Sequence, residues 1–214
     1  MASPTRRPTL AAGTPSWLLP AAAASLAAAW LTRRSTGGRA LALPAVAVTG
    51  GLLWFFRDPD RQATGEGLLA SADGVVQSID AWPDGRTRVA TFMNPLNVHV
   101  NRAPADGSVV SITHRPGGFL PAFDKDSDRN ERMVWIFDTE LGELEVVQIA
   151  GAMVRRIVPY LGIGDKIERG RRIGLIRFGS RVDVYLPPGV EPAVSVGDKT
   201  VAGVTRLDRE RTRD

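Results

Sequence analysis

The first 56 residues differ so sharply in composition from the rest of the chain that the two parts require different kinds of structure. This part holds two apolar runs, residues 16–30 (SWLLPAAAASLAAAW) and residues 41–56 (LALPAVAVTGGLLWFF). Each run is somewhat shorter than the roughly 20 residues that a straight helix needs to cross a bilayer. Arginines and tryptophans, which membrane interfaces favour, lie near the ends of both runs. We therefore expect residues 1–56 to form a membrane-associated segment of two short apolar helices.

Three interpretations of this segment are open. The runs could be short spans or a hairpin that dips into one leaflet, they could be a helical pair packed on the rest of the protein, or the first could be a cleaved signal peptide. The second apolar run argues against secretion. Arginines flank each run on both sides, so the positive-inside rule does not settle the orientation. These arginines are Arg6, Arg7, Arg33, Arg34 and Arg57.

From Arg57 onward the sequence has the pattern of a β-rich domain. Short stretches in which apolar and polar residues alternate recur, and Gly, Pro, Asp and Asn separate them at close intervals. Examples are GVVQSI, RVATFM, MVWIFDT, LEVVQI and RVDVYL. The predicted fold class is therefore mainly β (α+β), with a compact β-sandwich or barrel-sandwich-like domain over residues 57–206. A charged tail over residues 207–214 follows it.

Two pairs of short segments repeat within this domain. SADGVVQSI (71–79) is similar to PADGSVVSI (104–112), and GDKIERG (164–170) is similar to GDKTVAG (197–203). Paired turns of the second kind resemble those of the barrel-sandwich domains that carry biotin or lipoate. Such a carrier also needs a lysine on a hairpin between its halves, and none of the lysines here lies in one. The repeats therefore support a compact β-sandwich without deciding its function.

The composition excludes several kinds of chemistry. The chain has no cysteine, so disulfides, zinc–thiolate sites and cysteine nucleophiles are excluded. Its two histidines, His99 and His114, are too few for a polyhistidine centre, and we expect no metal. The net charge of +4 suits an anionic lipid surface as well as nucleic acid. Because the arginines gather beside the apolar runs, we expect a membrane partner and no nucleic acid.

The stretch LIRFGSRVDVYLP (175–187) contains the residues that point most directly to chemistry. Alternation of apolar residues predicts a strand from about Arg181, and Gly179 and Ser180 interrupt its start. A glycine there usually marks a bulge or a close approach of the backbone. A serine hydroxyl becomes a nucleophile when a base, usually a histidine oriented by a carboxylate, removes its proton.

His99 and Asp73 are the candidates for that base and that carboxylate. His99 lies in NVHVNR, so if Val98 and Val100 face the core, His99 faces a cleft or solvent. Each residue also has an explanation without catalysis: a surface or polar-core histidine for His99, a turn residue for Asp73, and a hydroxyl tolerated at a bulge for Ser180. Taken singly, each of these residues is explained more readily by structure than by catalysis.

These three residues lie in a series of five ordered motifs. Together the motifs resemble the short form of the phosphatidylserine decarboxylases, a pyruvoyl-dependent family with archaetidylserine decarboxylase-like members. The likeness runs from about residue 50 to about residue 190. The motifs occur in the order FFRDP (55–59), SADGVV (71–76), NPLNVHVNR (94–102), RNERM with FDTELG (129–142) and FGS (178–180).

The resemblance implies that the chain cuts itself between Gly179 and Ser180, giving a β chain 1–179 and an α chain 180–214. Ser180 would become a pyruvoyl group, which forms a Schiff base with the amine of the substrate. His99, supported by Asp73, would activate the serine. The implied reaction converts phosphatidylserine to phosphatidylethanolamine and CO2.

Two departures concern the long form of the family. Long-form members have a second histidine three residues before the one that matches His99, where this chain has Leu96. FGS followed by Arg181 also replaces the long form's LGST. Both features agree with the short form, and they leave His114 as an accessory candidate for the proton donor.

The resemblance also implies partners and a location. We expect a serine phospholipid as substrate, α and β chains from one precursor, and a homodimer. The protein would lie at the cell membrane with its catalytic domain in the cytoplasm.

Two other function classes compete with this interpretation. A membrane-anchored serine hydrolase could use Ser180, His99 and Asp73, but the chain lacks the G-x-S-x-G elbow around Ser180. A non-catalytic barrel-sandwich binding module would tolerate loss of Ser180 and His99.

Overall fold

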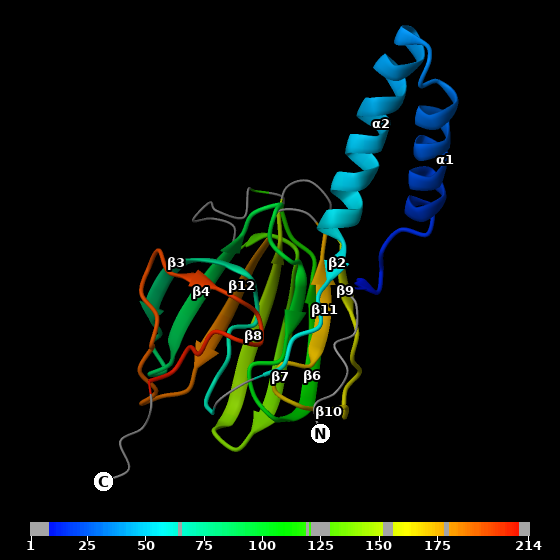
Figure 1. Ribbon diagram of the computed structural model, residues 1–214. Helices are drawn as coiled ribbons and strands as arrows, with labels where there is room; N and C mark the ends of the chain where they lie inside the picture. Colours follow the sequence, from blue (N-terminus) through cyan, green and yellow to red (C-terminus); the bar gives the residue numbers. More distant parts are fainter. Residues whose placement is uncertain are drawn as a thin grey trace. The chain divides into compact units, whose positions relative to one another are not determined.

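The computed structural model describes residues 9–209 except for residues 64–65, 119, 121–128, 152–155 and 178–179. The chain divides into two compact units, residues 1–60 and residues 61–214. Figure 1 shows a helical hairpin in the first unit and a β structure in the second.

The N-terminal unit consists of two helices bracketed by one pair of short strands. Strand β1 (Thr9–Leu10) pairs antiparallel with β2 (Arg57–Asp58), and helices α1 (Leu18–Leu31) and α2 (Thr36–Phe55) lie between them in the chain. The two predicted apolar helices are therefore present, but α2 is longer than its apolar run. It begins at Thr36 because the Ser35 hydroxyl accepts a hydrogen bond from the Gly38 N–H and caps the helix. With 20 residues, α2 is long and apolar enough to cross a membrane.

The second unit is built around an eight-stranded antiparallel sheet that curls into a half-barrel. A smaller sheet of three strands accompanies it, which confirms the mainly β prediction. In spatial order, the large sheet contains β10 (Lys166–Ile167), β6 (Gly107–Arg115), β7 (Arg132–Thr139), β8 (Gly142–Ala150), β12 (Ser180–Leu186), β4 (Thr87–Met93), β3 (Gly74–Ala81) and β13 (Lys199–Thr200). The small sheet contains β5 (Val100–Arg102), β11 (Arg172–Ile176) and β9 (Ile157–Pro159).

The core lies on one face of the large sheet, as the alternation in the sequence predicts. Large apolar side chains from the middle strands are fully buried there and pack in one cluster. Burying each such side chain contributes roughly 1.5–3 kcal/mol to stability. The largest of them include Trp135, Phe137, Leu144 and Leu186.

The two sequence repeats form two copies of one structural unit. Strand β13, from the repeat at 197–203, pairs with β3, and β10, from the repeat at 164–170, pairs with β6. The two copies occupy opposite edges of the large sheet. Their backbone hydrogen bonds match, because the Gly203 N–H donates to the Ala70 carbonyl at 2.8 Å and the Gly170 N–H to the Ala103 carbonyl at 2.8 Å.

Strand β12 lies at the centre of the large sheet and is buried along its whole length. It pairs with β8 on one side and with β4 on the other. On the face away from the core, Arg181 and Asp183 form a two-pronged ion pair at 2.7 and 2.6 Å. Their side chains are only 4% and 2% exposed, and Arg88 Nη1 lies 3.7 Å from Asp183 Oδ2, so the buried carboxylate is balanced by two arginines.

Asp183→Asn is expected to destabilise the protein by about 3–5 kcal/mol, because it leaves the Arg181 charge buried without its carboxylate. Glu191→Gln is the matched control: its ion pair with Arg209 is 73% and 69% exposed, and its loss is expected to cost less than about 1 kcal/mol. Thermal and urea unfolding of both variants measure this. Equal losses in the two variants would contradict the structural role of the buried pair.

Candidate active site

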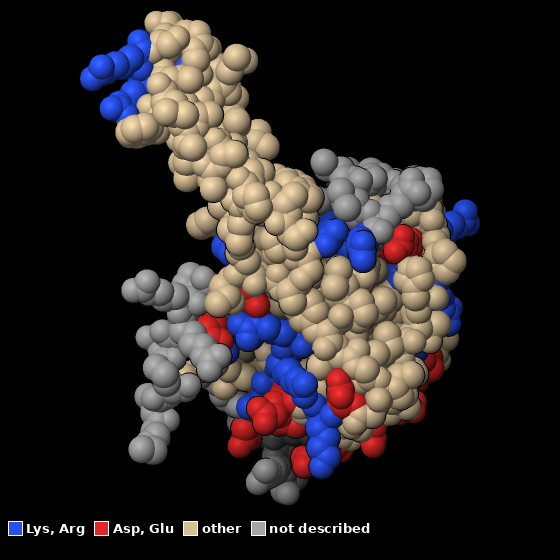
Figure 2. All heavy atoms as spheres, turned by 90° about the vertical axis from the view of Figure 1, so that its right-hand side faces the viewer, with Lys and Arg blue, Asp and Glu red and all other residues tan. Residues whose placement is uncertain are grey.

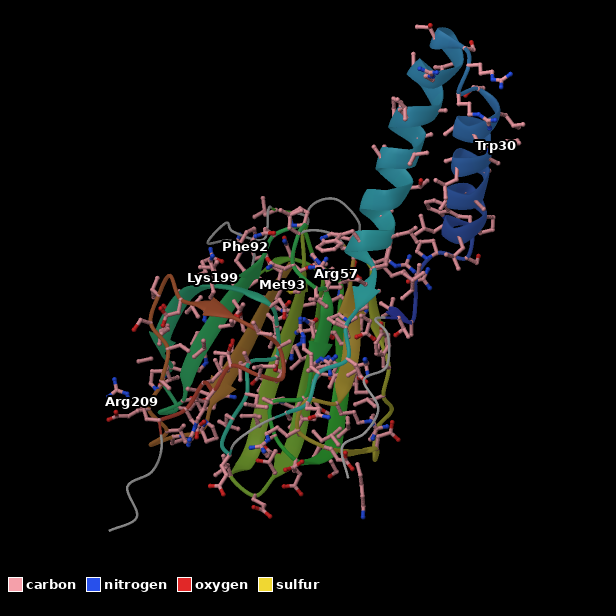
Figure 3. The ribbon with its side chains drawn as sticks, viewed as in Figure 1. Trp30, Arg57, Phe92, Met93, Lys199 and Arg209 are labelled. Carbon is pink, nitrogen blue, oxygen red and sulfur yellow. The ribbon has the colours of Figure 1, made fainter. Side chains whose placement is uncertain are left out.

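Ser180 is the first residue of β12 and is completely buried. It pairs across the sheet with Met93 of β4 and with Ala150 of β8. Figure 3 labels Met93 at the end of β4. The Ser180 Oγ has no hydrogen-bond partner among the described residues, and a buried hydroxyl in that state costs free energy. Gly179, the other predicted site residue here, lies outside the described part of the chain.

His99 is also completely buried, directly before β5. The alternation with Val98 and Val100 had allowed His99 to face a cleft or solvent. The structure shows that it does not face solvent. Every residue of β5 is buried as well, so both faces of this segment are enclosed and alternation cannot mark an open side. The His99 carbonyl accepts a hydrogen bond at 3.2 Å from the N–H of Ile176, four positions before Ser180.

The imidazole of His99 has a defined hydrogen bond on one nitrogen. Its Nδ1 lies 3.0 Å from the Asn97 carbonyl oxygen. A carbonyl can only accept, so this contact places a proton on Nδ1. In the neutral ring, Nε2 then carries the lone pair, which is the form that a general base needs.

The carboxylate of Asp73 is engaged with groups other than His99. Its two oxygens accept hydrogen bonds from Arg61 at 2.5 and 2.8 Å, and Oδ1 also accepts one from the Ala202 N–H at 2.9 Å. Arg61 donates in addition to the Ala202 carbonyl at 3.0 Å. The structure thus brings Asp73 to Arg61, and not into hydrogen-bond contact with the imidazole. Sequence reasoning missed Arg61, although it lies close after the FFRDP motif.

Asp106 is the structural counterpart of Asp73 in the second repeat. Its Oδ1 accepts a hydrogen bond from the Arg169 N–H at 2.7 Å, just as Asp73 does from Ala202. Within the described residues no arginine side chain pairs with Asp106. Asp106 therefore serves the turn through this backbone contact, and Arg61 is what distinguishes the first copy from the second.

His114 lies in strand β6 and not in a loop. Its Nε2 is 3.0 Å from Glu131 Oε1, and its side chain is half exposed. The Glu131 carbonyl accepts a hydrogen bond from the N–H of Ala150, the residue that pairs with Ser180. His114 is thus linked to the strand beside Ser180 without being in contact with Ser180 itself.

A buried polar chain connects the two sheets next to these residues. Gln148 Nε2 donates to Asn101 Oδ1 at 2.7 Å, and Trp135 Nε1 donates to Gln148 Oε1 at 2.7 Å. Asn101 follows His99 by two positions, while Gln148 pairs with Val182 of β12. The chain therefore ties the segment that carries His99 to the strands around Ser180. These three residues lie in stretches whose alternation predicts ordinary strands. Nothing in the sequence there indicates that their side chains bond to one another.

Arg177 lies on the segment that leads into Ser180, and Arg156 is hydrogen-bonded to it through the backbone. The Arg177 N–H, three positions before Ser180, donates to the Arg156 carbonyl at 3.1 Å. Burial of the Arg177 guanidinium and the nearby charge of Arg156 lower the pKa of Arg177, and Tyr160 opposes them. Two positive charges are thus close to each other at this point of the chain. Among the described residues, no group of three or more His, Asp or Glu could hold a metal ion.

These features define a class of protein, a β domain with an internal repeat that encloses a serine at the start of its central strand and a histidine before β5. A family model described as phosphatidylserine decarboxylase matches residues 49–207, well over half of the chain. The chain belongs to the phosphatidylserine decarboxylase family.

Two similar proteins carry the name of this family, and a third carries a related name. A phosphatidylserine decarboxylase proenzyme of Thermobifida fusca is 65% identical, over 95% of this chain and 94% of its own. One of Streptomyces avermitilis is 61% identical over 97% of both chains. A protein of Methanococcoides burtonii, provisionally named an archaetidylserine decarboxylase proenzyme, is 51% identical over 75% of this chain and 76% of its own.

Proposed function

We propose that the chain is a proenzyme that cleaves itself between Gly179 and Ser180 and then decarboxylates phosphatidylserine to phosphatidylethanolamine and CO2. The observation that carries this proposal is the Ser180 hydroxyl, buried and without a described hydrogen-bond partner at the start of a central strand. Such a group needs a functional explanation. Attack of this hydroxyl on a neighbouring backbone carbonyl is such an explanation. An ordinary serine hydrolase, in contrast, needs a serine that is accessible to its substrate.

In the proposed cleavage, the Ser180 Oγ attacks the carbonyl carbon of Gly179. The peptide bond breaks as an ester forms, and the hydroxyl proton passes to Nε2 of His99. That proton then passes to the freed Ser180 amine. Elimination breaks the Cβ–Oγ bond, releases Gly179 as a carboxylate and leaves a dehydroalanine. Addition of water to it with loss of ammonia gives a pyruvoyl group at position 180. A glycine before the serine helps, because without a Cβ it admits the close approach that the attack needs.

The residues around position 180 fit a pyruvoyl group. In the conversion the Ser180 Oγ leaves with Gly179 and the Cβ becomes a methyl group. Because this Oγ has no hydrogen-bond partner among the described residues, its departure breaks no described side-chain hydrogen bond. Once formed, this group supplies an electron sink for the pair released with CO2. His99 would then return a proton to the carbon that lost the carboxylate, because histidine exchanges protons near neutral pH.

Asp73 is proposed to support His99 during cleavage, in line with the family resemblance. In the structure this carboxylate is hydrogen-bonded to Arg61. To support His99, it would have to move from the guanidinium toward the imidazole. The Ala202 N–H, which donates to Oδ1, would keep the carboxylate near the edge strand β13.

Arg156 and Arg177 are proposed to bind the phosphate of the substrate. They lie on the two segments that converge on Ser180: Arg177 follows β11 and precedes Ser180, while Arg156 lies between Ala150 and β9. Two nearby guanidinium groups are mutually repulsive, and a bound phosphodiester would relieve that repulsion. A serine phospholipid carries this phosphate close to the amine that reacts.

The remaining proposals concern partners. We propose that helices α1 and α2 hold the protein at the cell membrane, where its lipid substrate resides, with the β unit in the cytoplasm. The processed α and β chains would stay together, and two such molecules would form a homodimer.

Ser180→Ala is expected to remain one chain of residues 1–214, because no hydroxyl attacks Gly179. The wild-type protein is expected to give residues 1–179 and residues 180–214, the smaller without a free N-terminal amine. Intact mass under denaturing conditions distinguishes these species. Ser195→Ala, which changes an exposed serine, is the control and should process normally. A folded wild-type chain that stays intact after prolonged incubation would disprove the mechanism.

Asp73→Asn is expected to slow self-cleavage by about 100-fold, because the amide cannot support the histidine as an anion. Asp106→Asn is the matched control from the other repeat, and its cleavage rate should stay within about twofold of wild type. Both amides keep an oxygen that can accept the backbone hydrogen bond. Rates come from the time course of the cleaved fraction.

Arg61→Gln tests whether Asp73 supports His99 directly or acts only through its ion pair with Arg61. If this variant cleaves as slowly as Asp73→Asn, the effect of Asp73 belongs to its ion pair with Arg61, and direct support of His99 is disproved.

Arg156→Gln is expected to raise KM for phosphatidylserine by about tenfold and to leave self-cleavage unchanged. A charge-assisted hydrogen bond contributes roughly 1.5–3 kcal/mol, which is of that order. Arg209→Gln, in which an exposed arginine is changed, is the control. Steady-state decarboxylation in mixed micelles measures KM and kcat. An unchanged KM would remove Arg156 from the substrate site.

A further inference from the structure

The charges of the helical hairpin are confined to its two ends. The first 57 residues contain no Asp or Glu. Between residue 9 and residue 56, the arginines are Arg33, Arg34 and Arg39, and all three lie at or next to the turn between α1 and α2. Figure 2 shows blue side chains at that turn and an uncharged surface along the helices on the face it displays. Arg57 follows the other end of α2.

Each end of the hairpin also pairs an arginine with a tryptophan. The Arg33 guanidinium lies 4.5 Å from the ring centre of Trp30 at the turn, and that of Arg57 lies 4.2 Å from the ring centre of Trp54 at the opposite end of α2. In Figure 3 the labelled Trp30 and Arg57 lie at opposite ends of the hairpin. Tryptophan and arginine at two levels are typical of a segment that meets two membrane–water interfaces.

The polar side chains between these two levels are satisfied within their own helices. The Ser25 hydroxyl donates to the Ala21 carbonyl at 2.8 Å, and the Thr49 hydroxyl donates to the Ala45 carbonyl at 2.8 Å. Such internal bonding is what hydrocarbon requires, because lipid offers no partner for a polar group. The middle of the hairpin therefore suits the core of a bilayer.

We infer that the hairpin crosses the whole bilayer and places the turn between α1 and α2 on the side opposite to both of its ends. With a rise of about 1.5 Å per residue, the 20 residues of α2 span about 30 Å, the thickness of the hydrocarbon core. Helix α1, with 14 residues, is shorter by roughly 9 Å. Long arginine side chains that reach toward the headgroups, together with local thinning of the bilayer, accommodate that difference.

Two alternative arrangements fit these observations less well. A hairpin that dips into one leaflet would leave Arg33, Arg34 and Arg39 at the bilayer centre, where charged side chains are costly and where the helices supply no acid to neutralise them. A hairpin lying flat on the surface would need one polar face. Leu41 and Leu43 project from opposite sides of α2, and both are largely exposed, so α2 has no polar face to turn toward water.

The natural absence of cysteine makes a direct test possible. Three single-cysteine variants of the full chain are prepared: Ser35→Cys at the turn, Ala47→Cys within α2, and Ser195→Cys as the matched control in the β unit. All three positions are exposed in the protein itself. Spheroplasts that express each variant are treated with a membrane-impermeant maleimide, before and after permeabilisation, and the labelled fraction is read from the mass shift.

The inference predicts that the cysteines at positions 35 and 195 react from opposite sides, with rates in intact spheroplasts that differ at least tenfold and become similar after permeabilisation. The cysteine at position 47 should react only in detergent. Labelling of positions 35 and 195 from the same side would overturn the inference. So would a position 35 that reacts only in detergent, a position 47 that reacts in intact membranes, or protein recovered in the soluble fraction. None of these outcomes depends on the proposed reaction, since labelling is read without activity.

Discussion

The buried ion pair between Arg181 and Asp183 constrains the whole β unit, because it fixes the strand on which the site is built. Two charges in the middle of a sheet are tolerable when their geometry is satisfied, and the two-pronged contact achieves this. Arg181 follows Ser180 directly, so the alternation along the strand places the serine on the face opposite to this ion pair. Pairing with Met93 and Ala150 then holds the backbone at the serine from both sides.

The internal repeat gives the site its scaffold, and a single side chain breaks the symmetry. In both copies an aspartate accepts a backbone hydrogen bond from the residue before a closing glycine, so both aspartates serve the turn. Arg61 binds the first aspartate alone. Asp73 thus has a buried cationic neighbour, Arg61, that its counterpart in the other repeat does not share. In this way one copy of a duplicated turn can take on a function in addition to its structural one.

The sequence predicted the strands, the two apolar helices and the family, since these rest on local periodicity and ordered motifs. It did not predict the length of α2, because the Ser35 cap extends a helix beyond its apolar residues. It also missed Arg61 and the chain of Asn101, Gln148 and Trp135, whose partners are far apart in sequence. His99 was expected to face a cleft or solvent, and the structure buries it together with every residue of the strand β5 that follows, so alternation there does not mark an open side.

The place of Ser180 at the first position of β12 has a consequence for how the molecule holds together. A break just before this residue would leave a short chain that supplies the central strand β12 and the edge strand β13 of a sheet whose other strands belong to the long chain. The two chains would be interlocked through hydrogen bonds on both sides of β12. Unfolding would then become a dissociation, so the stability of the cut protein would rise with its concentration, whereas that of the uncut chain would not.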